Sequence, residues 1–276
     1  MATVLMFSLA QSPGVTTAAV ATTRSWHRNA ILIEADTSTA SAVLTGYFQG
    51  QYNGADASLI NLAVAAAQHG GIDHNDLWSQ LRPLDSTDTQ TATKWLLPGL
   101  MEPKAAPSLD RLWGDIISAA DTFEAAGTDV IIDAGRWAVG DVRSALMRAA
   151  DAVLVFARPT LPSAWAIRAR LEEIRGGLSE LGRGNFLSMV AVEGPTNPYT
   201  PSQVASSLGL PLLGTLPWDP RSAAVFSDGS AELNPSKLAK RPYTRAINSL
   251  SASLQTELDG RRRLLQDALD AEIGDI

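Results

Sequence analysis

Residues 4–17 have the sequence VLMFSLAQSPGVTT, and the rest of the chain is organised around this stretch. Its first half is apolar and predicts a buried strand over residues 3–9. Gly14 then permits a tight turn, and the small polar residues that follow predict a helix from Thr16 to about Trp26. The stretch therefore predicts a strand, a turn and a helix N-terminus in immediate succession.

A turn that opens a helix in this way is suited to binding phosphate. Backbone N–H groups of the first helical turn are unpaired, and the helix dipole favours an anion there. Gly14 lets a phosphate approach closely, and Thr16 stands where such loops hold Mg²⁺. The pattern G-x-x-x-x-G-K-[ST] is incomplete, because Leu9 replaces the first glycine and Val15 the lysine, while Pro13 removes an N–H donor. The loop alone fits an ordinary strand–turn–helix connection equally well.

The composition of the 276 residues is that of a globular protein and excludes several kinds of site. There are no cysteines, so the chain has no disulfide, cysteine-based metal site or cysteine nucleophile. The three histidines lack the H-x-x-x-H spacing of a zinc site. The net charge of −7 disfavours a nucleic-acid-binding surface overall, although a local basic patch remains compatible with it. The N-terminus lacks a signal pattern and no apolar run is long enough to span a membrane, so we expect a cytoplasmic protein.

Short apolar runs alternate with helical patterns along the chain. This alternation predicts an α/β fold: a doubly wound, mainly parallel sheet with helices on both faces, in the Rossmann-like three-layer arrangement of P-loop NTPases. We expect one α/β domain over residues 1–258 and a C-terminal helical tail over 259–276, separated by a charged break at 257–260. Ser108 is expected to cap a helix. The predicted strands cover residues 3–9, 30–36, 93–97, 129–133, 152–157, 186–192 and 211–216.

Polar side chains follow three of these strands. The first strand leads to Thr16, the second ends in Glu34 and Asp36, and the third ends in Asp133. Because ligands of such sheets bind at the carboxyl ends of the strands, we expect these side chains to lie near one another. One carboxylate there could hold Mg²⁺ and a second could orient an attacking water. Each acid alone is more often a helix cap or a solvated strand end, and it is their order that favours a site.

The ordered motifs resemble the MinD/ParA family of P-loop ATPases, the SIMIBI-class proteins whose deviant Walker A loop is K-G-G-x-G-K-[ST]-T. The matching residues are AQSPGVTT at 10–17. The family's D-x-D after the second strand matches EAD at 34–36, and its D-x-x-x-D strand matches DVIID at 129–133. Two later segments also match, ADAVLVFARPTLPS at 150–163 and LGLPLLGTLPWD at 208–219.

The resemblance covers about residues 3–230 and implies a site for ATP or ADP with Mg²⁺. It implies that Thr16 and Asp133 hold the metal and that Asp36 is the catalytic carboxylate. It also implies a homodimer. The residues that it assigns to nucleotide binding are Ser12, Pro13, Gly14, Val15, Thr16, Thr17, Pro217 and Trp218. For Trp218, a packed loop residue is the alternative.

The loop departs from the family by lacking both of its lysines. Ala10 occupies the position of the lysine that reaches across the family dimer, and Val15 that of the usual P-loop lysine. Charge-assisted hydrogen bonds contribute about 1.5–3 kcal/mol each, so two losses would weaken nucleotide binding by orders of magnitude. The family's adenine-reading V-x-N-R segment is AVEG here, at 191–194.

Two functions remain open at this point. The first is a degenerate family member with weak or absent ATP hydrolysis, which positions or scaffolds a larger assembly of a pilus, secretion or partitioning system through an unidentified protein partner. CpaE/TadZ-like localisation factors and actinobacterial partitioning-like proteins are similar. The second is an active ParA/MinD-type ATPase of chromosome or plasmid partitioning, with lysines supplied from elsewhere. Val15 favours the first, because the missing lysine removes a contact to the transferring phosphoryl group.

Two basic segments lie near the C-terminus. Residues 237–245, KLAKRPYTR, could contact DNA or an acidic partner, but a solvated helix start is favoured. Residues 261–269, RRRLLQDAL, are similar to the amphipathic membrane anchor of MinD-like proteins. Acids in and beyond this segment oppose binding to anionic lipid, so we expect a packing or partner helix and no membrane association.

Overall fold

The computed structural model describes residues 1–85, 89–119, 123–124, 126–138, 140–180, 186–230 and 234–274, the last of these with side chains up to residue 263. Its strands are β1 (Thr3–Ser8), β2 (Ala30–Glu34), β3 (Arg82–Pro83), β4 (Lys94–Leu97), β5 (Asp129–Arg136), β6 (Ala152–Ala157), β7 (Leu187–Val192) and β8 (Leu212–Leu216). Its α-helices are α1 (Val15–Ser25), α2 (Leu59–His69), α3 (His74–Ser79), α4 (Leu112–Ser118), α6 (Ser144–Ala149), α7 (Leu161–Ser179), α8 (Pro201–Leu208), α9 (Pro220–Ser227), α10 (Pro235–Leu238) and α11 (Pro242–Gly274). A π-helical turn, η1 (Val43–Tyr47), and a 3₁₀ segment, η2 (Pro103–Leu109), complete the described elements.

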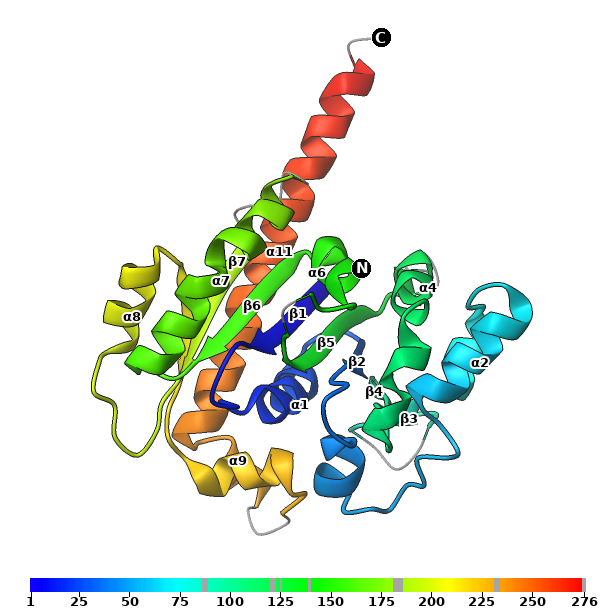
Figure 1. Cartoon of the computed structure of the whole chain (residues 1–276), viewed down its shortest axis with the longest axis horizontal. Coiled ribbons are helices and arrows are strands. Elements are labelled where there is room, and N and C mark those ends of the chain that lie inside the picture. The colour runs from blue at the N-terminus through cyan, green and yellow to red at the C-terminus, as the bar shows by residue number, and fades with distance from the viewer. Residues whose placement is uncertain are drawn as a thin grey trace.

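The strands form one sheet in the order β3-β4-β2-β5-β1-β6-β7-β8 (Figure 1). Neighbouring strands are parallel except for β3, which runs antiparallel to β4 at the edge. The predicted doubly wound α/β fold is therefore confirmed. The sequence did not indicate β3, because two residues show no periodicity and Pro83 is tolerated only at a sheet edge.

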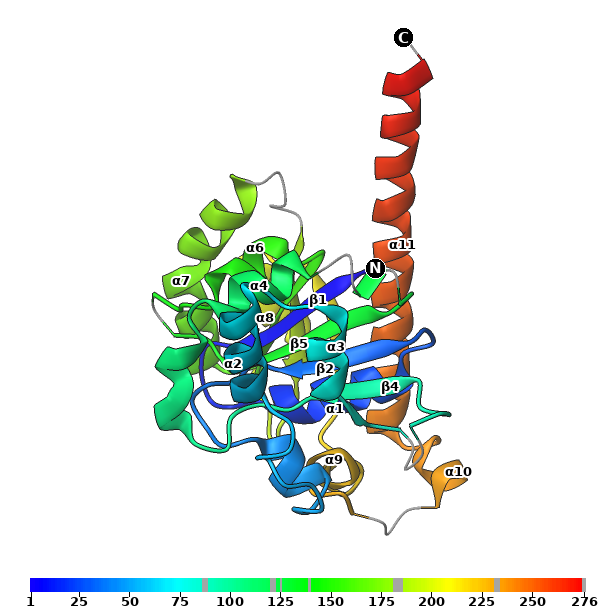
Figure 2. The same cartoon turned by 90° about the vertical axis from the view of Figure 1, so that its right-hand side faces the viewer.

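The two faces of the sheet are covered by different helices (Figures 1 and 2). Along β1, Val4 and Met6 join the apolar cluster beneath α1, α9 and α11. Leu5 and Phe7 join the opposite cluster beneath α2, α3, α4, α6, α7 and α8. Successive residues of a strand point to opposite faces, so one continuous apolar run supplies both layers of the core.

Helix α11 is one continuous helix, so the predicted break at 257–260 is wrong. A single glycine, here Gly260, costs only about 1 kcal/mol in a helix. Packing holds the helix on both sides of it, since Leu254 and Leu258 are buried and Arg261 Nη1 donates to the carbonyl of Asp151 (2.5 Å). The C-terminal part of α11 projects beyond the layered body (Figures 1 and 2). None of the described helices is long and apolar enough to cross a lipid bilayer.

The predicted cap at Ser108 is also wrong. Ser108 lies inside η2, and α4 begins only at Leu112, with Arg111 at its N-cap position and no side-chain cap. The 3₁₀ segment begins at Pro103 and continues past Ser108 to Leu109, which leaves Ser108 with no helix N-terminus to cap.

The loop after β1 lies where the direction of strand succession changes. From β1 the chain passes to β2 on one side of the sheet, and from β5 it passes to β6 on the other side of β1. Ser8, the last residue of β1, is level with Arg136 of β5 and with Phe156 of β6. In doubly wound sheets ligands bind at such a switch point, outside the carboxyl ends of the strands. The topology thus places any ligand site beside residues 9–14.

Candidate functional site

The loop between β1 and α1 has left-handed backbone at three residues, of which only Gly14 is a glycine. Gln11 and Ser12 have positive φ angles of 64° and 41°, and Gly14 has a φ of 91°. Gln11 and Ser12 stand at the two positions where the K-G-G-x-G pattern has glycine. Left-handed backbone costs a non-glycine residue about 1–2 kcal/mol, so the surrounding structure must hold these residues in place.

Side-chain hydrogen bonds fasten this loop to the start of α7 and to the end of β5. Gln11 Oε1 accepts from the hydroxyls of Thr160 (3.1 Å) and Ser163 (2.9 Å) at the start of α7. Ser12 Oγ accepts from Nη2 of Arg136 (2.9 Å) at the end of β5. These contacts offset the backbone cost and keep the loop open across the switch point.

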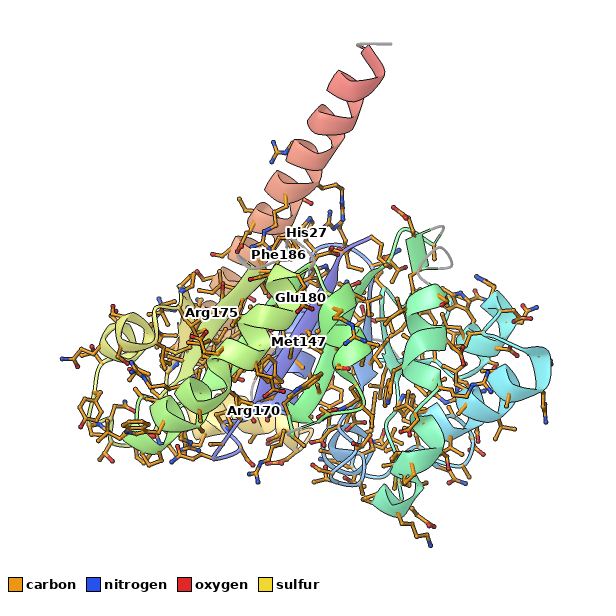
Figure 3. The ribbon with its side chains drawn as sticks, turned by 45° about the horizontal axis from the view of Figure 1, so that its top comes forward. His27, Met147, Arg170, Arg175, Glu180 and Phe186 are labelled. Atoms are coloured by element: carbon orange, nitrogen blue, oxygen red, sulfur yellow. The ribbon has the colours of Figure 1, made fainter. Side chains whose placement is uncertain are left out.

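Helix α7 is itself held from two sides, which makes it a firm support for the loop. Arg170 Nη1 donates to the carbonyl of Trp137 (3.0 Å) in the segment after β5. Arg175 Nη2 donates to the carbonyl of Gly209 (2.5 Å) at the end of α8. Figure 3 shows both arginines along α7, with Arg170 nearer its N-terminus.

The first turn of α1 offers its N–H groups but no cationic side chain. Gly14 occupies the N-cap position and has no side chain to cap the helix. The N–H groups of the first turn are consequently left for another acceptor. Val15 begins α1 and is only 4% exposed, within the apolar cluster beneath α1, and Pro13 is buried as well.

Asp133 lies beside this helix start, in the C-terminal half of β5, and is fully buried. Its Oδ1 accepts from the N–H of Gly135 (2.9 Å), whereas Oδ2 has no partner of normal hydrogen-bond geometry among the described residues. Burial raises the pKa of Asp133 to about 7, and the charge of Glu34 adds to the rise. The Thr16 hydroxyl lies near the same carboxyl and acts against the rise, although it makes no hydrogen bond of normal geometry to Oδ2. An unpaired buried carboxylate oxygen beside a hydroxyl is an arrangement that a hard cation such as Mg²⁺ would complete.

Asp36 reaches the same place from β2. Its Oδ1 accepts from the N–H (2.8 Å) and the hydroxyl (2.7 Å) of Ser38. Its Oδ2 lies so close to Gly135 that a Cβ there would be 1.9 Å away, and its charge contributes to the raised pKa of Asp133. Gly135 has a φ of 55° and occupies the irregular pairing of β5 with β1, so it gives Asp36 room at the strand end. The structure thus brings together Thr16, Asp36 and Asp133.

Glu34, the other acid of the EAD segment, uses its carboxylate to hold the fold together. It is fully buried, and its carboxylate accepts from the hydroxyl of Ser41 (2.5 Å) and the N–H groups of Val43 (3.2 Å) and Gly99 (3.0 Å). Burial raises the pKa of Glu34, while these donors act against the rise. Glu34 joins the ends of β2 and β4 to the turn η1 and has no free oxygen for a ligand.

An ion pair that the sequence did not indicate secures the acidic strand ends. Arg143 is 2% exposed and pairs with Asp141 (2.6 Å). Burial acts to raise the pKa of Asp141, but Arg143 holds it below its ordinary value. The same guanidinium donates to the carbonyls of Ala35 (2.7 Å), Ala134 (2.6 Å) and Arg136 (2.9 Å). In the sequence, only the D-x-R spacing at 141–143 could have suggested this ion pair, and that spacing is common on solvated surfaces.

Pro217 and Trp218 follow β8, which is separated from β1 by β6 and β7. At about 4.8 Å between neighbouring strands, the axes of β1 and β8 are roughly 14 Å apart. Trp218 is 50% exposed, and the next residue, Asp219, caps α9 and pairs with Arg241 (2.5 Å). The assignment of Pro217 and Trp218 to nucleotide binding stays a prediction.

Parts of both basic segments are used within the fold. In 237–245, Arg241 is paired with Asp219 and Tyr243 is buried. In 261–269, the guanidinium of Arg261 lies 4.1 Å from the centre of the Phe186 ring and donates to a backbone carbonyl. These contacts leave fewer cationic groups for a partner than the sequence suggested.

Comparisons with known proteins identify the fold. No protein-family model and no curated protein matches the chain. A ParA-family ATPase from Chlorobium tepidum TLS is 11% identical, with a TM-score of 0.69 over 91% of this chain and 97% of that one. The MinC:MinD cell division protein complex of Aquifex aeolicus contains a chain 13% identical, with a TM-score of 0.67 over 93% and 96%. An ATP complex of McdA from Cyanothece is 14% identical, with a TM-score of 0.64 over 94% and 96%. The chain therefore has the MinD/ParA-type P-loop ATPase fold.

Proposed function

We propose that this chain is a degenerate MinD/ParA-like protein that binds a nucleotide at the end of β1, hydrolyses ATP slowly or not at all, and positions or scaffolds a larger assembly. One observation carries the proposal: Asp133 keeps an unpaired buried oxygen beside Thr16, while the lysine position next to it holds the buried Val15. The cation-binding half of the site is retained, whereas the loop lacks the lysine whose charge would act on the transferred phosphate.

The retained groups suit ATP or ADP with Mg²⁺. Thr16 and Asp133 offer the hydroxyl and carboxylate oxygens that Mg²⁺ prefers, and the loop 11–14 and the first turn of α1 offer backbone N–H groups to phosphates. When bound, the cation would neutralise part of the phosphate charge. Asp36 is placed to accept a hydrogen bond from a water at the same edge. The ATP complex of the McdA relative supports a nucleotide as the ligand class.

Slow hydrolysis follows from the loop. Catalysis of phosphoryl transfer rests on positioning and on positive charge around the transferred group. Residues 9–17 supply backbone N–H groups and no basic side chain. The alternative, an active ATPase of a partitioning system, predicts Mg-ATP turnover that Asp36→Ala abolishes.

A scaffolding role needs partners. We propose a homodimer and an unidentified protein partner of a localisation, secretion or partitioning system, for which the MinC:MinD complex among the structural relatives is the support. Sedimentation of the purified chain with and without Mg-ATP tests the dimer. A monomer under both conditions contradicts it.

Calorimetry of the purified chain with Mg-ATP and Mg-ADP tests nucleotide binding, and a phosphate-release assay tests turnover. We expect measurable binding of at least one nucleotide, weakened about tenfold or more in Asp133→Asn, and unchanged in the exposed control Asp110→Asn. We expect turnover far below 1 per second. Binding of neither nucleotide overturns the proposal, and so does turnover near 1 per second that Asp36→Ala abolishes.

A further inference from the structure

The loop has no basic residue of its own, but a basic side chain reaches it from a neighbouring strand. Arg136 is the last residue of β5, and its Nη2 donates to Ser12 Oγ (2.9 Å) in the middle of the loop. The side chain of Arg136 is exposed. The guanidinium therefore lies at the surface of the loop, where a bound phosphate group would lie, on the edge that also carries Asp36 and Asp133.

The backbone of Arg136 is rigidly placed. Arg136 pairs with Ser8 of β1, and the N–H of the following residue, Trp137, donates to the carbonyl of Ser8 (2.9 Å). The carbonyl of Arg136 accepts from Nη2 of the buried Arg143 (2.9 Å). A fixed base under an exposed, long side chain allows the guanidinium to move from Ser12 to a ligand without rearranging the strand.

The charge of Arg136 is uncompensated. Arg143, seven residues further on, is neutralised by Asp141 and donates to three carbonyls. Arg136 takes part in none of the ion pairs of the described residues, and its bond to Ser12 is to a neutral hydroxyl. A guanidinium has five N–H donors in a planar fork that matches phosphate oxygens, so most of its donors are available.

We propose that Arg136 is the phosphate-binding cation of this site, supplying from β5 the positive charge that the loop lacks. Its ligand is the polyphosphate group of a nucleoside di- or triphosphate, so this inference rests on the proposed function. The unpaired Oδ2 of Asp133 is an independent indication of a ligand at the same edge, because that buried oxygen lacks a partner within the described residues. Arg136 and Asp133 then contact opposite sides of one ligand, the first its anionic oxygens and the second its cation.

Calorimetry with Mg-ADP and Mg-ATP on the full chain tests this role. The variants are Arg136→Ala, Arg136→Gln and Arg136→Lys, with Arg168→Ala as the matched control. Arg168 is, like Arg136, an exposed arginine, but it lies on α7. Its Nη2 donates to the carbonyl of Ser207 (2.6 Å). We expect Arg136→Ala and Arg136→Gln to weaken binding at least about tenfold, Arg136→Lys to recover part of the loss, and the control to bind like the wild type.

Salt dependence separates a ligand contact from a purely structural role. Loss of a cation that contacts phosphate should make nucleotide affinity less sensitive to salt between roughly 50 and 300 mM, whereas loss of loop order should leave that sensitivity unchanged. Melting curves without ligand show whether each variant folds, and Arg136→Gln retains bulk and hydrogen-bonding capacity if alanine perturbs the loop.

Each outcome bears on one of the two proposals. Wild-type affinity in Arg136→Ala or Arg136→Gln, with binding intact in the wild type, overturns the role of Arg136 and leaves the proposed function standing. Unchanged salt dependence in a weakened Arg136→Ala also overturns it. A wild-type chain that binds neither nucleotide overturns the proposed function, and this role is lost with it.

Discussion

Asp129 begins β5 and Asp133 lies in its C-terminal half, and the protein uses these two acids of one D-x-x-x-D motif in opposite ways. Asp129 accepts from the N–H of Ala2 (2.7 Å), Nε1 of Trp26 (2.9 Å) and Nε of Arg28 (2.7 Å), so both its oxygens are paired. Asp133 is buried just as deeply but keeps one oxygen unpaired. The comparison teaches that a buried carboxylate is structural where donors surround it and is a candidate ligand where they do not.

The largest effect is expected at the paired Asp129. Asp129→Asn removes the charge opposite Arg28 and disturbs the contacts that join β5, α1 and the N-terminus. Breaking a buried ion pair costs about 3–5 kcal/mol, and for a domain of this size we expect the melting temperature to fall by roughly 10 °C. Thermal unfolding followed by circular dichroism measures this. A melting temperature like that of the exposed control Asp110→Asn would show that Asp129 is not structural.

The sequence predicts the sheet that holds Asp129 and Asp133, but it does not predict that their roles differ. The apolar runs and their spacing were enough to predict the parallel sheet, because burial on both faces imposes a continuous apolar pattern. The convergence of Thr16, Asp36 and Asp133 followed from topology. The sequence alone does not distinguish Asp129 from Asp133, because the partners of Asp129 lie about a hundred residues or more away. Among the described residues, Oδ2 of Asp133 has no partner.

The same reason explains the residues that were missed. Arg136 and Arg143 act through long-range contacts, at Ser12 and at the end of β2, that no periodicity encodes. Glu34 belongs to a motif that suggested ligand chemistry, yet its three donors come from loops whose path the sequence does not reveal. Helix α11 crosses Gly260 because tertiary packing outweighs local propensity.

A smaller effect is expected for Val15→Lys, which tests the loop beside Asp133. Val15 is buried in the apolar cluster beneath α1, so a lysine there should cost about 1–3 kcal/mol and lower the melting temperature by a few degrees. Val15→Leu is the apolar control. If Val15→Lys instead keeps its stability and gains about tenfold in Mg-ATP affinity, the position is still an open phosphate site and Val15 is not a structural core residue.

Ala10→Lys restores the other missing lysine and sharpens the same test. In the family this side chain acts across a dimer interface, so we expect it to raise Mg-ATP affinity only under conditions where the chain dimerises. Calorimetry at protein concentrations below and above the dimerisation midpoint measures this. A gain that is independent of concentration would mean that the lysine acts within one chain.

The smallest effect is expected at the unpaired Asp133, and it has the opposite sign to that of Asp129→Asn. The pKa of Asp133 is about 7 in the folded chain and near 4 when unfolded, so the folded state binds more protons between these values. Stability therefore falls as the pH rises from about 4 to 7 and stays lowered above that range. Without ligand, Asp133→Asn should stabilise the chain by about 1–2 kcal/mol at pH 8, and less at pH 5. Urea unfolding at both pH values measures the difference, and a loss of stability at pH 8 would contradict the unpaired state of Asp133.

The most direct test of the account is the shift in melting temperature on adding Mg-ADP to the wild type, Asp133→Asn and Asp129→Asn in parallel. A ligand that binds only the folded state raises the melting temperature with its concentration. We predict a rise in the wild type, a similar rise from a lower starting point in Asp129→Asn, and little or no rise in Asp133→Asn. An equal rise in all three, or none in the wild type, would contradict the claim that the carboxyl end of β5 is a nucleotide site.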